Sequence, residues 1–248
     1  MKLLIIYIII GMLGQLIDGS MGMAYGVSCS TFMRAFTGLP AVTISASIHF
    51  SEIFTTLSST LSHLKFQNVD KKLFFKLLLP GVIGGVTGAV ALSKMNHEVW
   101  DITIDVYLII MGIWILTKVR TKKIREKKLR KIEVLGFIGG ASDAVGGGGW
   151  GPIVTSTLLA RDNDVRTTIG TVNSVEFFVT VTESIVFFFL QGDAFMKFNT
   201  PILGLMIGGV IASPFAALLC SKLPKKVIMI MIGVLIILIN GWSLIGLF

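Results

Sequence analysis

Four consecutive glycines, Gly146 to Gly149, interrupt a chain that otherwise consists mostly of large aliphatic and aromatic residues. They lie within GGASDAVGGGGWGPIV, residues 139–154, and a new segment with Pro152 near its first turn follows them. Glycine has no side chain to screen its backbone N–H, and the first N–H groups of a helix have no partner within it. Free amides at a helix N-terminus favour an anion, so this break predicts a site for a small anionic solute.

The same pattern occurs once more, in the first half of the chain. DGSMGMAYG at 18–26 aligns with DAVGGGGWG at 143–151. The alignment pairs Asp18 with Asp143, Gly22 with Gly147, Tyr25 with Trp150 and Gly26 with Gly151. A self-similar second half indicates that the chain is a duplication, with one glycine-broken segment in each copy.

Acidic residues inside apolar segments are a second set of candidates, because a charge within a membrane is costly and usually functional. Asp18 and Asp143 stand at the two breaks, where a short carboxylate can accept the free amides of the next turn, so we expect each to brace its break. Glu52 and Glu176 lie at matched positions in the segments HFSEIFTT and NSVEFFVT. They have no such local duty, so a proton-coupling role is predicted, with an interhelical hydrogen bond as the alternative.

Solute contacts are predicted at the breaks and in the segment that follows each of them. His49 and Asn173 are at matched positions and could contact a solute from the side, while Thr171 offers a hydroxyl donor. No basic residue is expected well inside a span, because Arg34 and Lys94 fall at segment ends, where their side chains can reach the interface. The predicted solute-binding set is Gly22, Tyr25, Gly26, Gly146, Gly147, Gly148, Gly149, Trp150, His49, Asn173 and Thr171.

The elements that position these residues are predicted from a composition typical of a membrane protein. Of 248 residues, 53% are hydrophobic and 15% are charged, and the mean hydropathy is +0.83. Several apolar runs approach the roughly 20 residues that cross a membrane as a helix, and none alternates as a barrel strand would. They lie at 41–64, 73–93, 99–117, 168–190, 200–221 and 227–248, with shorter runs at 3–17, 22–36, 134–145 and 150–160.

The two copies divide the chain into a first repeat at 1–118, a basic linker at 119–131 and a second repeat at 132–248. From Lys118 to Lys131 there are nine Lys or Arg against one acid, which places this stretch in the cytoplasm. If each broken segment turns back, four of the 22 basic residues lie outside, against seven if it crosses. The predicted fold is an all-α polytopic membrane protein with two inverted repeats, each a glycine-broken re-entrant hairpin plus three transmembrane helices.

Composition also excludes several classes of function. The net charge of +8 is concentrated in the linker, so it predicts contact with membrane lipid and not with nucleic acid. Cys29 and Cys220 have no metal-ligand spacing, and the sequence contains no phosphate-binding loop and no zinc-protease motif. We therefore predict no enzyme activity, no metal and no cofactor. A homodimer is compatible with the sequence, although no residue pattern specifies it.

GFIGGASDAVGGGGWGPIVTSTLLAR, its partner GQLIDGSMGMAYG and the following SIHFSEIFTTLSSTLSHLKFQNVD resemble the sulfite exporter TauE/SafE family of bacterial membrane transporters. The resemblance covers nearly the whole chain. It implies secondary transport of a small anion, often sulfite, a sulfonate or another sulfur-containing compound, across the cytoplasmic membrane. The first copy, SMGMAYG, has fewer glycines than the second, so the two hairpins are not expected to play equal roles.

Three functions remain open at this stage. The leading one is a secondary transporter or exporter of a small sulfur-containing anion such as sulfite, thiosulfate or a sulfonate, held by backbone amides of the two breaks at the midplane. The second is a carrier coupled to Na⁺ or H⁺ that uses the four membrane carboxylates as cation ligands. The third is a membrane-embedded accessory subunit that carries no solute.

Overall fold

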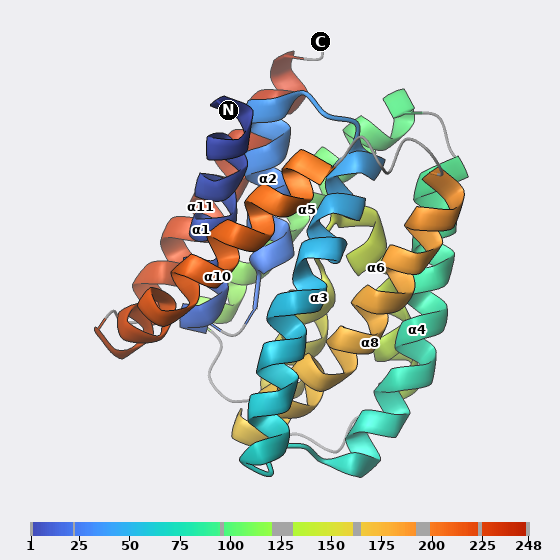
Figure 1. Ribbon diagram of the computed structural model, residues 1–248, viewed down its shortest axis with the longest axis vertical. Coiled ribbons are helices and arrows are strands. Elements are labelled where there is room, and N and C mark those ends of the chain that lie inside the picture. The colour runs from blue at the N-terminus through green and yellow to red at the C-terminus, as the bar shows by residue number, and fades with distance from the viewer. Residues whose placement is uncertain are drawn as a thin grey trace.

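Helices account for all regular structure in the computed structural model, which describes residues 2–21, 23–94, 97–120, 131–160, 165–191, 199–222 and 225–246 (Figure 1). The helices of the first half are α1 (Lys2–Met21), α2 (Tyr25–Thr37), α3 (Ala41–Lys65), α4 (Lys71–Lys94) and α5 (His97–Arg120). Those of the second half are α6 (Ile132–Gly146), the π-helical turn η1 (Gly151–Thr155), α7 (Ser156–Ala160), α8 (Val165–Gln191), α10 (Asn199–Lys222) and α11 (Lys225–Gly246). The all-α prediction is confirmed, and each predicted apolar run coincides with helical structure to within a few residues.

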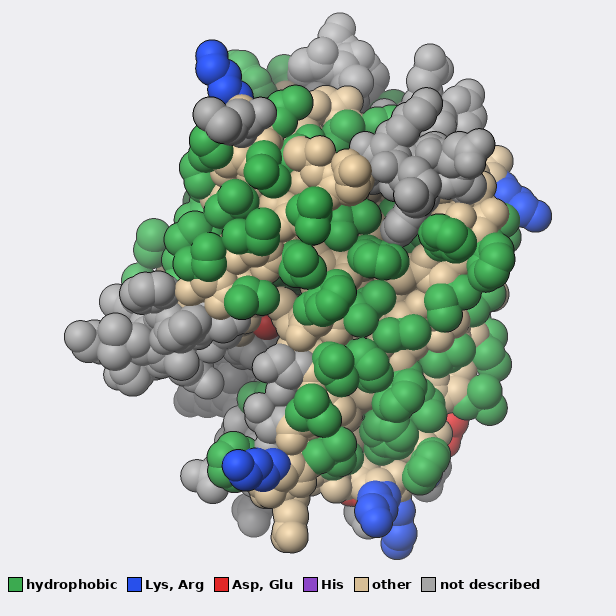
Figure 2. Space-filling model, viewed as in Figure 1, with side chains coloured by type: hydrophobic (Ala, Val, Ile, Leu, Met, Phe, Trp, Pro, Cys, Tyr) green, Lys and Arg blue, Asp and Glu red, His purple; other side chains and the backbone are tan. Residues whose placement is uncertain are grey.

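The outer surface is that of a protein surrounded by lipid. By length and hydropathy alone, two of the described helices could each cross a membrane, Lys71–Lys94 and Thr167–Gln191. Large apolar side chains such as Phe75, Phe189 and Trp242 are 68–79% exposed. Figure 2 shows hydrophobic side chains over the middle of one face, with the Lys and Arg side chains toward its ends. An apolar band between charged ends is the pattern expected across a bilayer.

The helices α3 and α8 run in opposite directions, and so do α4 and α10 (Figure 1). In Figure 1, α3 runs from the upper end, near the N-terminus, to the lower end, and α4 returns upward. α8 starts at the lower end and runs upward beside α3, against which it packs, whereas α10 runs downward. The start of α1 and the end of α11 both lie at the upper end (Figure 1).

The first helix of each half packs against a long helix of the other half, α1 against α10 and α6 against α4. Glycines allow these backbones to approach closely. A side chain at Gly208 of α10 would meet the backbone of Ile8, and one at Gly84 of α4 would meet the carbonyl group of Phe137. The two halves are therefore interlocked and do not form separate bodies.

The two breaks meet in the interior of the molecule. α6 ends at Gly146 and is capped by Gly147, whose φ is +66°. Gly148 follows with a φ of +154°, a backbone region that is essentially restricted to glycine. The first break passes through Ala24, with a φ of 87°, while Gly22 lies outside the described residues. A side chain at Gly26 would meet the carbonyl oxygen of Gly147, so the backbones of the two tips are in direct contact.

Candidate functional site

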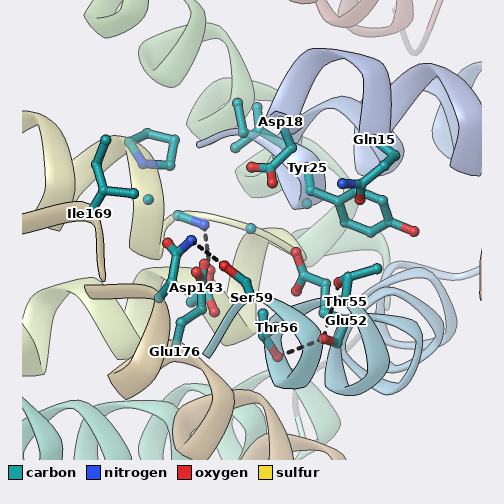
Figure 3. Close-up of a pocket in the computed structure, with 18 of the residues that line it drawn as sticks. Gln15, Asp18, Tyr25, Glu52, Thr55, Thr56, Ser59, Asp143, Ile169 and Glu176 are labelled. Atoms are coloured by element: carbon teal, nitrogen blue, oxygen red, sulfur yellow. Dashed lines mark hydrogen bonds between the residues drawn. The ribbon is translucent and has the colours of Figure 1, made fainter. Parts of the chain in front are cut away.

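A cavity of about 320 Å³ lies between the two breaks and the middle of α3 and α8. Its volume falls at the lower end of the range of small-molecule sites, roughly 300–1,000 Å³. Figure 3 shows Asp18 and Tyr25 on one side of it, facing Glu52 and Glu176 on the other. The predicted residues that line the cavity are Asp18, Tyr25, Gly26, Glu52, Asp143, Gly148, Gly149, Asn173 and Glu176.

Other predicted solute contacts lie behind this wall, namely His49, Gly146, Gly147, Trp150 and Thr171. Trp150 is fully buried among apolar residues and donates its indole N–H to the carbonyl oxygen of Val172 at 3.1 Å. The Thr171 hydroxyl accepts the backbone N–H of Asp70 at 2.8 Å, just before α4 begins. These residues form the framework of the site and do not line the cavity. The sequence did not reveal this, because a sequence pattern does not distinguish an aromatic residue that faces a cavity from one that faces the core.

Asp143 holds the second break through both its side chain and its backbone. Its Oδ1 accepts the backbone N–H groups of Gly149 at 2.6 Å and of Trp150 at 2.8 Å. Its carbonyl oxygen accepts the N–H of Gly148 at 3.0 Å and also that of Gly147. Asp143 is only 2% exposed, so these bonds replace those that water would otherwise make. This is the geometry of a brace.

The amides predicted to hold an anion are therefore occupied. Each backbone N–H from Gly147 to Trp150 donates to Asp143. A solute could take these donors only by displacing the carboxylate and carbonyl oxygens that they already bind. In this conformation the break shapes the cavity, and the groups that contact the solute have to come mainly from side chains.

The first break repeats one of these bonds among the described residues. Asp18 accepts a hydrogen bond from the backbone N–H of Tyr25, the residue that aligns with Trp150. The Tyr25 hydroxyl lies 3.3 Å from Ser51 Oγ and donates to the carbonyl oxygen of Leu205 at 3.4 Å. The ring of Tyr25 is thereby fixed at the cavity wall, which it lines.

The lining is acidic. Asp18, Glu52, Asp143 and Glu176 face the cavity together with His63, and no Lys or Arg is among the described residues that line it. Neutral donors are also present, including the Asn173 amide, which donates to Ser59 Oγ at 3.0 Å (Figure 3). Two like charges 4 Å apart repel by about 4 kcal/mol at an effective dielectric constant of ~20. The cavity therefore suits an anion only when its carboxyl groups are protonated or paired with a cation.

Glu183 of α8 is a candidate that the matched-acid pattern does not predict. Its side chain is fully buried, and its Oε2 lies 3.1 Å from His49 Nδ1. His49, Asp143 and Glu183 present polar atoms that all lie within 4.8 Å of one another. The sequence does contain a signal for Glu183, since it is an acid inside the apolar run VTESIVFFFL. It was missed because a role was predicted only for acids at matched positions in both copies.

A second departure concerns Arg34, which the sequence places at a segment end with its side chain in the interface. In the structure Arg34 Nε lies 2.7 Å from Asp105 Oδ1, and the two side chains are 9% and 0% exposed. Asp105 lies within α5, so its carboxylate is buried at a depth where an unpaired charge would be costly. The guanidinium group turns inward because it neutralises this carboxylate.

An all-helical, apolar-surfaced molecule with two broken segments around a polar cavity has the architecture of a secondary transporter. The chain matches the family model described as "Sulfite exporter TauE/SafE" over residues 7–242, and it belongs to that family. It is 41% identical over 254 aligned residues to the "Probable membrane transporter protein YtnM" of Bacillus subtilis (strain 168), with 99% of this chain and 84% of that protein covered. No solved structure matches the chain significantly.

Family membership confirms the resemblance seen in the sequence. The protein is a polytopic membrane transporter and not an enzyme. This speaks against the accessory subunit that carries no solute. A transporter of this kind acts on a small solute, and the acidic cavity between the breaks has room for one.

Proposed function

We propose that this protein is a secondary transporter of a small sulfur-containing anion, such as sulfite, thiosulfate or a sulfonate, and that it binds this anion in the cavity between the two breaks. The observation that carries the proposal is the position of a small polar cavity where both broken segments meet. The family description supplies the sulfur chemistry. Transport then requires the cavity to face each side of the membrane in turn.

An inverted repeat would provide that alternation, and three observations support one. Asp18 bonds the N–H of Tyr25, and Asp143 bonds that of Trp150, so aligned residues make the same contact. The pairing of α1 with α10 corresponds to that of α6 with α4 when the halves are exchanged. The aligned helices α3 and α8 run in opposite directions (Figure 1).

The direction in which the cavity faces follows from charge. It extends from Glu52, midway along α3, to His63 near the lower end of that helix. The same end carries the exposed residues Lys65, Lys71 and Lys72, so the positive-inside rule places it in the cytoplasm. The conformation described here is thus proposed to face inward, in a cytoplasmic membrane.

Proton coupling follows from the acidic lining. An anion that enters beside ionised carboxylates is repelled, whereas protonated carboxyl groups can donate hydrogen bonds to it. Binding of the anion and binding of protons at Glu52 and Glu176 therefore favour each other. We propose that the anion and at least one proton cross the membrane together.

This coupling predicts a pH dependence that substitution should remove. Uptake of radiolabelled thiosulfate by proteoliposomes should fall as the pH rises between about 6 and 8, by up to about tenfold per pH unit for each coupled proton. In the double variant Glu52→Gln and Glu176→Gln the profile should flatten, because both side chains stay neutral. Glu133→Gln, at an exposed site on α6, is the matched control. A parental pH profile in the double variant would exclude these two acids from coupling.

The four carboxylates also favour a second candidate, a carrier in which a metal cation such as Na⁺ accompanies the solute. Acidic side chains are suitable cation ligands where, as among the described residues of this cavity, no Lys or Arg accompanies them. Replacing sodium with choline in the same vesicles separates the two candidates. Loss of thiosulfate uptake in choline at constant pH would favour sodium coupling, and unchanged uptake would favour protons.

A further inference from the structure

We propose that His49 of α3 and Glu183 of α8 form the proton-coupling site of this transporter, and that Glu52 connects the site to the cavity. The proposal deepens the function proposed above and rests on it. It moves the essential proton from the cavity wall to a buried pair one layer behind that wall. The duplication does not point to this pair, since Glu183 aligns with Ser59 in the first copy.

The pair is buried and does not line the cavity. His49 and Glu183 are both fully buried, with 3.1 Å between Nδ1 and Oε2, and neither lines the cavity. The His49 ring stacks on Phe187, with 6.1 Å between ring centroids. On the other side, α4 has Gly85, where a Cβ would lie 2.6 Å from Glu183 Oε1. A glycine at that position therefore makes room for the carboxyl group.

The second nitrogen of His49 shows that the pair must hold a proton. Nε2 lies 3.1 Å from the carbonyl oxygen of Asp143, which can only accept, so Nε2 carries a hydrogen. In a neutral imidazole, Nδ1 then carries a lone pair, and Glu183 Oε2 lies only 3.1 Å from it. Two lone pairs at this distance repel each other unless a proton lies between them. The pair is therefore either a protonated Glu183 donating to Nδ1, or an imidazolium donating to a carboxylate.

Other hydrogen bonds that could take the place of this proton are missing from the described surroundings. His49 Nδ1, Asp143 Oδ2 and both carboxyl oxygens of Glu183 are buried atoms without a hydrogen-bond partner. A deprotonated pair would leave a bare carboxylate against a lone pair at membrane depth, which is costly. The pair without its proton is thus unstable in this conformation. A coupling site requires this, because the proton must be bound before the conformation forms.

The groups that face the pair from the surrounding helices are acidic. They are Glu52 on α3, Asp143 on α6, Glu176 on α8, Asp18 on α1, which acts on Glu52, and the phenol Tyr107 on α5, which faces Asp143. Among the described residues, none of the groups that act on Glu183 is a Lys or an Arg. The negative electrostatic potential of these acidic groups favours a positive charge, such as a proton, over an anion at the pair.

Glu52 gives the site its route to the cavity. Its Oε2 lies 3.4 Å from His49 Nδ1, and the residue lines the cavity. In the transfer step the N–H bond at Nδ1 breaks and an O–H bond forms at Glu52 Oε2, from which the proton passes to water or solute in the cavity. No electrons are exchanged, and Glu183 stays negative until the next proton arrives.

The site is also linked to the second break. The Asp143 carbonyl oxygen that accepts from His49 Nε2 accepts the N–H of Gly148 at 3.0 Å as well. A shift of the imidazole on deprotonation would therefore act directly on the end of α6. Proton occupancy and the conformation of the break are coupled through a single atom.

The first test uses thiosulfate, which remains an anion throughout the neutral range, and vesicles that contain a pH-sensitive dye. In the wild type, a gradient of about one pH unit should drive accumulation of up to about tenfold per coupled proton. Glu183→Gln should retain exchange of internal for external thiosulfate but lose both the accumulation and the dye signal. Glutamine has a similar size and can donate to Nδ1, so the fold is preserved. The exposed Glu133→Gln control should behave as the wild type.

The second test does not depend on transport. Infrared difference spectra of the purified protein at low and high pH should contain the C=O band of a buried, protonated carboxyl group if Glu183 holds the proton, or the ring bands of an imidazolium if His49 holds it. Either signal should be lost in Glu183→Gln, whereas His49→Gln should shift the first and abolish the second. Glu183→Asp, which keeps a titratable group, should restore part of the coupling.

Each outcome decides between the alternatives. Proton-driven accumulation and an unchanged infrared band in Glu183→Gln would overturn the proposal, as would a metal ion that copurifies with the wild type and is lost in this variant. If the wild type moves neither thiosulfate, sulfite nor a sulfonate, the proposed function fails. The infrared measurement would still show whether His49 and Glu183 share a proton.

Discussion

Gly148→Ala is expected to abolish folded, transport-competent protein. Gly148 has a φ of +154°, and a Cβ there would meet the backbone N of Val27 and the Cα of Gly26 across the contact between the two breaks. The unfavourable backbone region costs about 1–3 kcal/mol, and overpacking costs about 1–3 kcal/mol more. Size-exclusion chromatography in detergent, a melting curve and thiosulfate uptake would measure the loss.

Substitutions at two other glycines separate the cost of the backbone conformation from the cost of overpacking. Gly38 ends α2 with a φ of +62° and has open space around its Cβ position, so Gly38→Ala tests the backbone term alone. Gly26 is helical, and a Cβ there would meet the carbonyl oxygen of Gly147, so Gly26→Ala tests the contact alone. We expect a mild loss for the first and a severe loss for the second. A Gly148→Ala protein as stable as Gly38→Ala would contradict the tight contact between the tips.

Asp143→Ala is expected to destabilise the protein strongly and to stop transport. The change removes the acceptor of the Gly149 and Trp150 N–H groups, which would remain buried without partners. Each unpaired buried group costs about 1–3 kcal/mol. The melting temperature and the yield of monodisperse protein are the measurements, with uptake of thiosulfate as the functional readout.

Asp143→Asn separates the brace from the charge. Asparagine keeps an oxygen acceptor at the position of Oδ1, so its stability should stay close to that of the wild type if the brace is the main role. An equal loss of melting temperature in Asp143→Asn and Asp143→Ala would mean that the negative charge of Asp143 stabilises the break more than its hydrogen-bond acceptor does. Asp18→Asn is the counterpart in the first break, where Tyr25 is the one described residue whose backbone N–H is bonded to the carboxylate. A smaller effect is expected there than at Asp143.

Helix positions could be predicted well from the sequence. Lipid does not hydrogen-bond a backbone, so a long apolar run has to be helical and its length is set by the bilayer. The run 41–64 became α3 at Ala41–Lys65, and 168–190 became α8 at Val165–Gln191. The breaks were predictable for a related reason, since consecutive glycines such as Gly146 to Gly149 do not sustain a helix.

Partners between helices could not be predicted in the same way. Arg34 and Asp105 are 71 positions apart, and no local pattern signals that they will meet. His49 and Glu183 lie on different helices, and only the antiparallel contact of α3 with α8 brings them together. The duplication revealed residues with a matched partner and left Glu183, which has none, unnoticed.

The chemistry of the second break was predicted in part. The sequence indicated both a carboxylate that could use the amides and an anion that could do so, but the two compete for the same donors. In the structure Asp143 takes the N–H groups of Gly149 and Trp150. A carboxylate a few residues away along the chain is always present at a high local concentration, whereas a solute has to bind from solution.

The interlocked packing of α1 with α10 and of α6 with α4 has a consequence for biosynthesis. α1 leaves the ribosome first, but α10 begins only at Asn199, so the first broken segment has no permanent neighbour during most of translation. The surface of α1 that packs against α10 therefore stays without this partner until the second half has been made. The two halves therefore mature together, and a chain cut within the basic linker would yield two fragments that each supply the neighbour the other lacks.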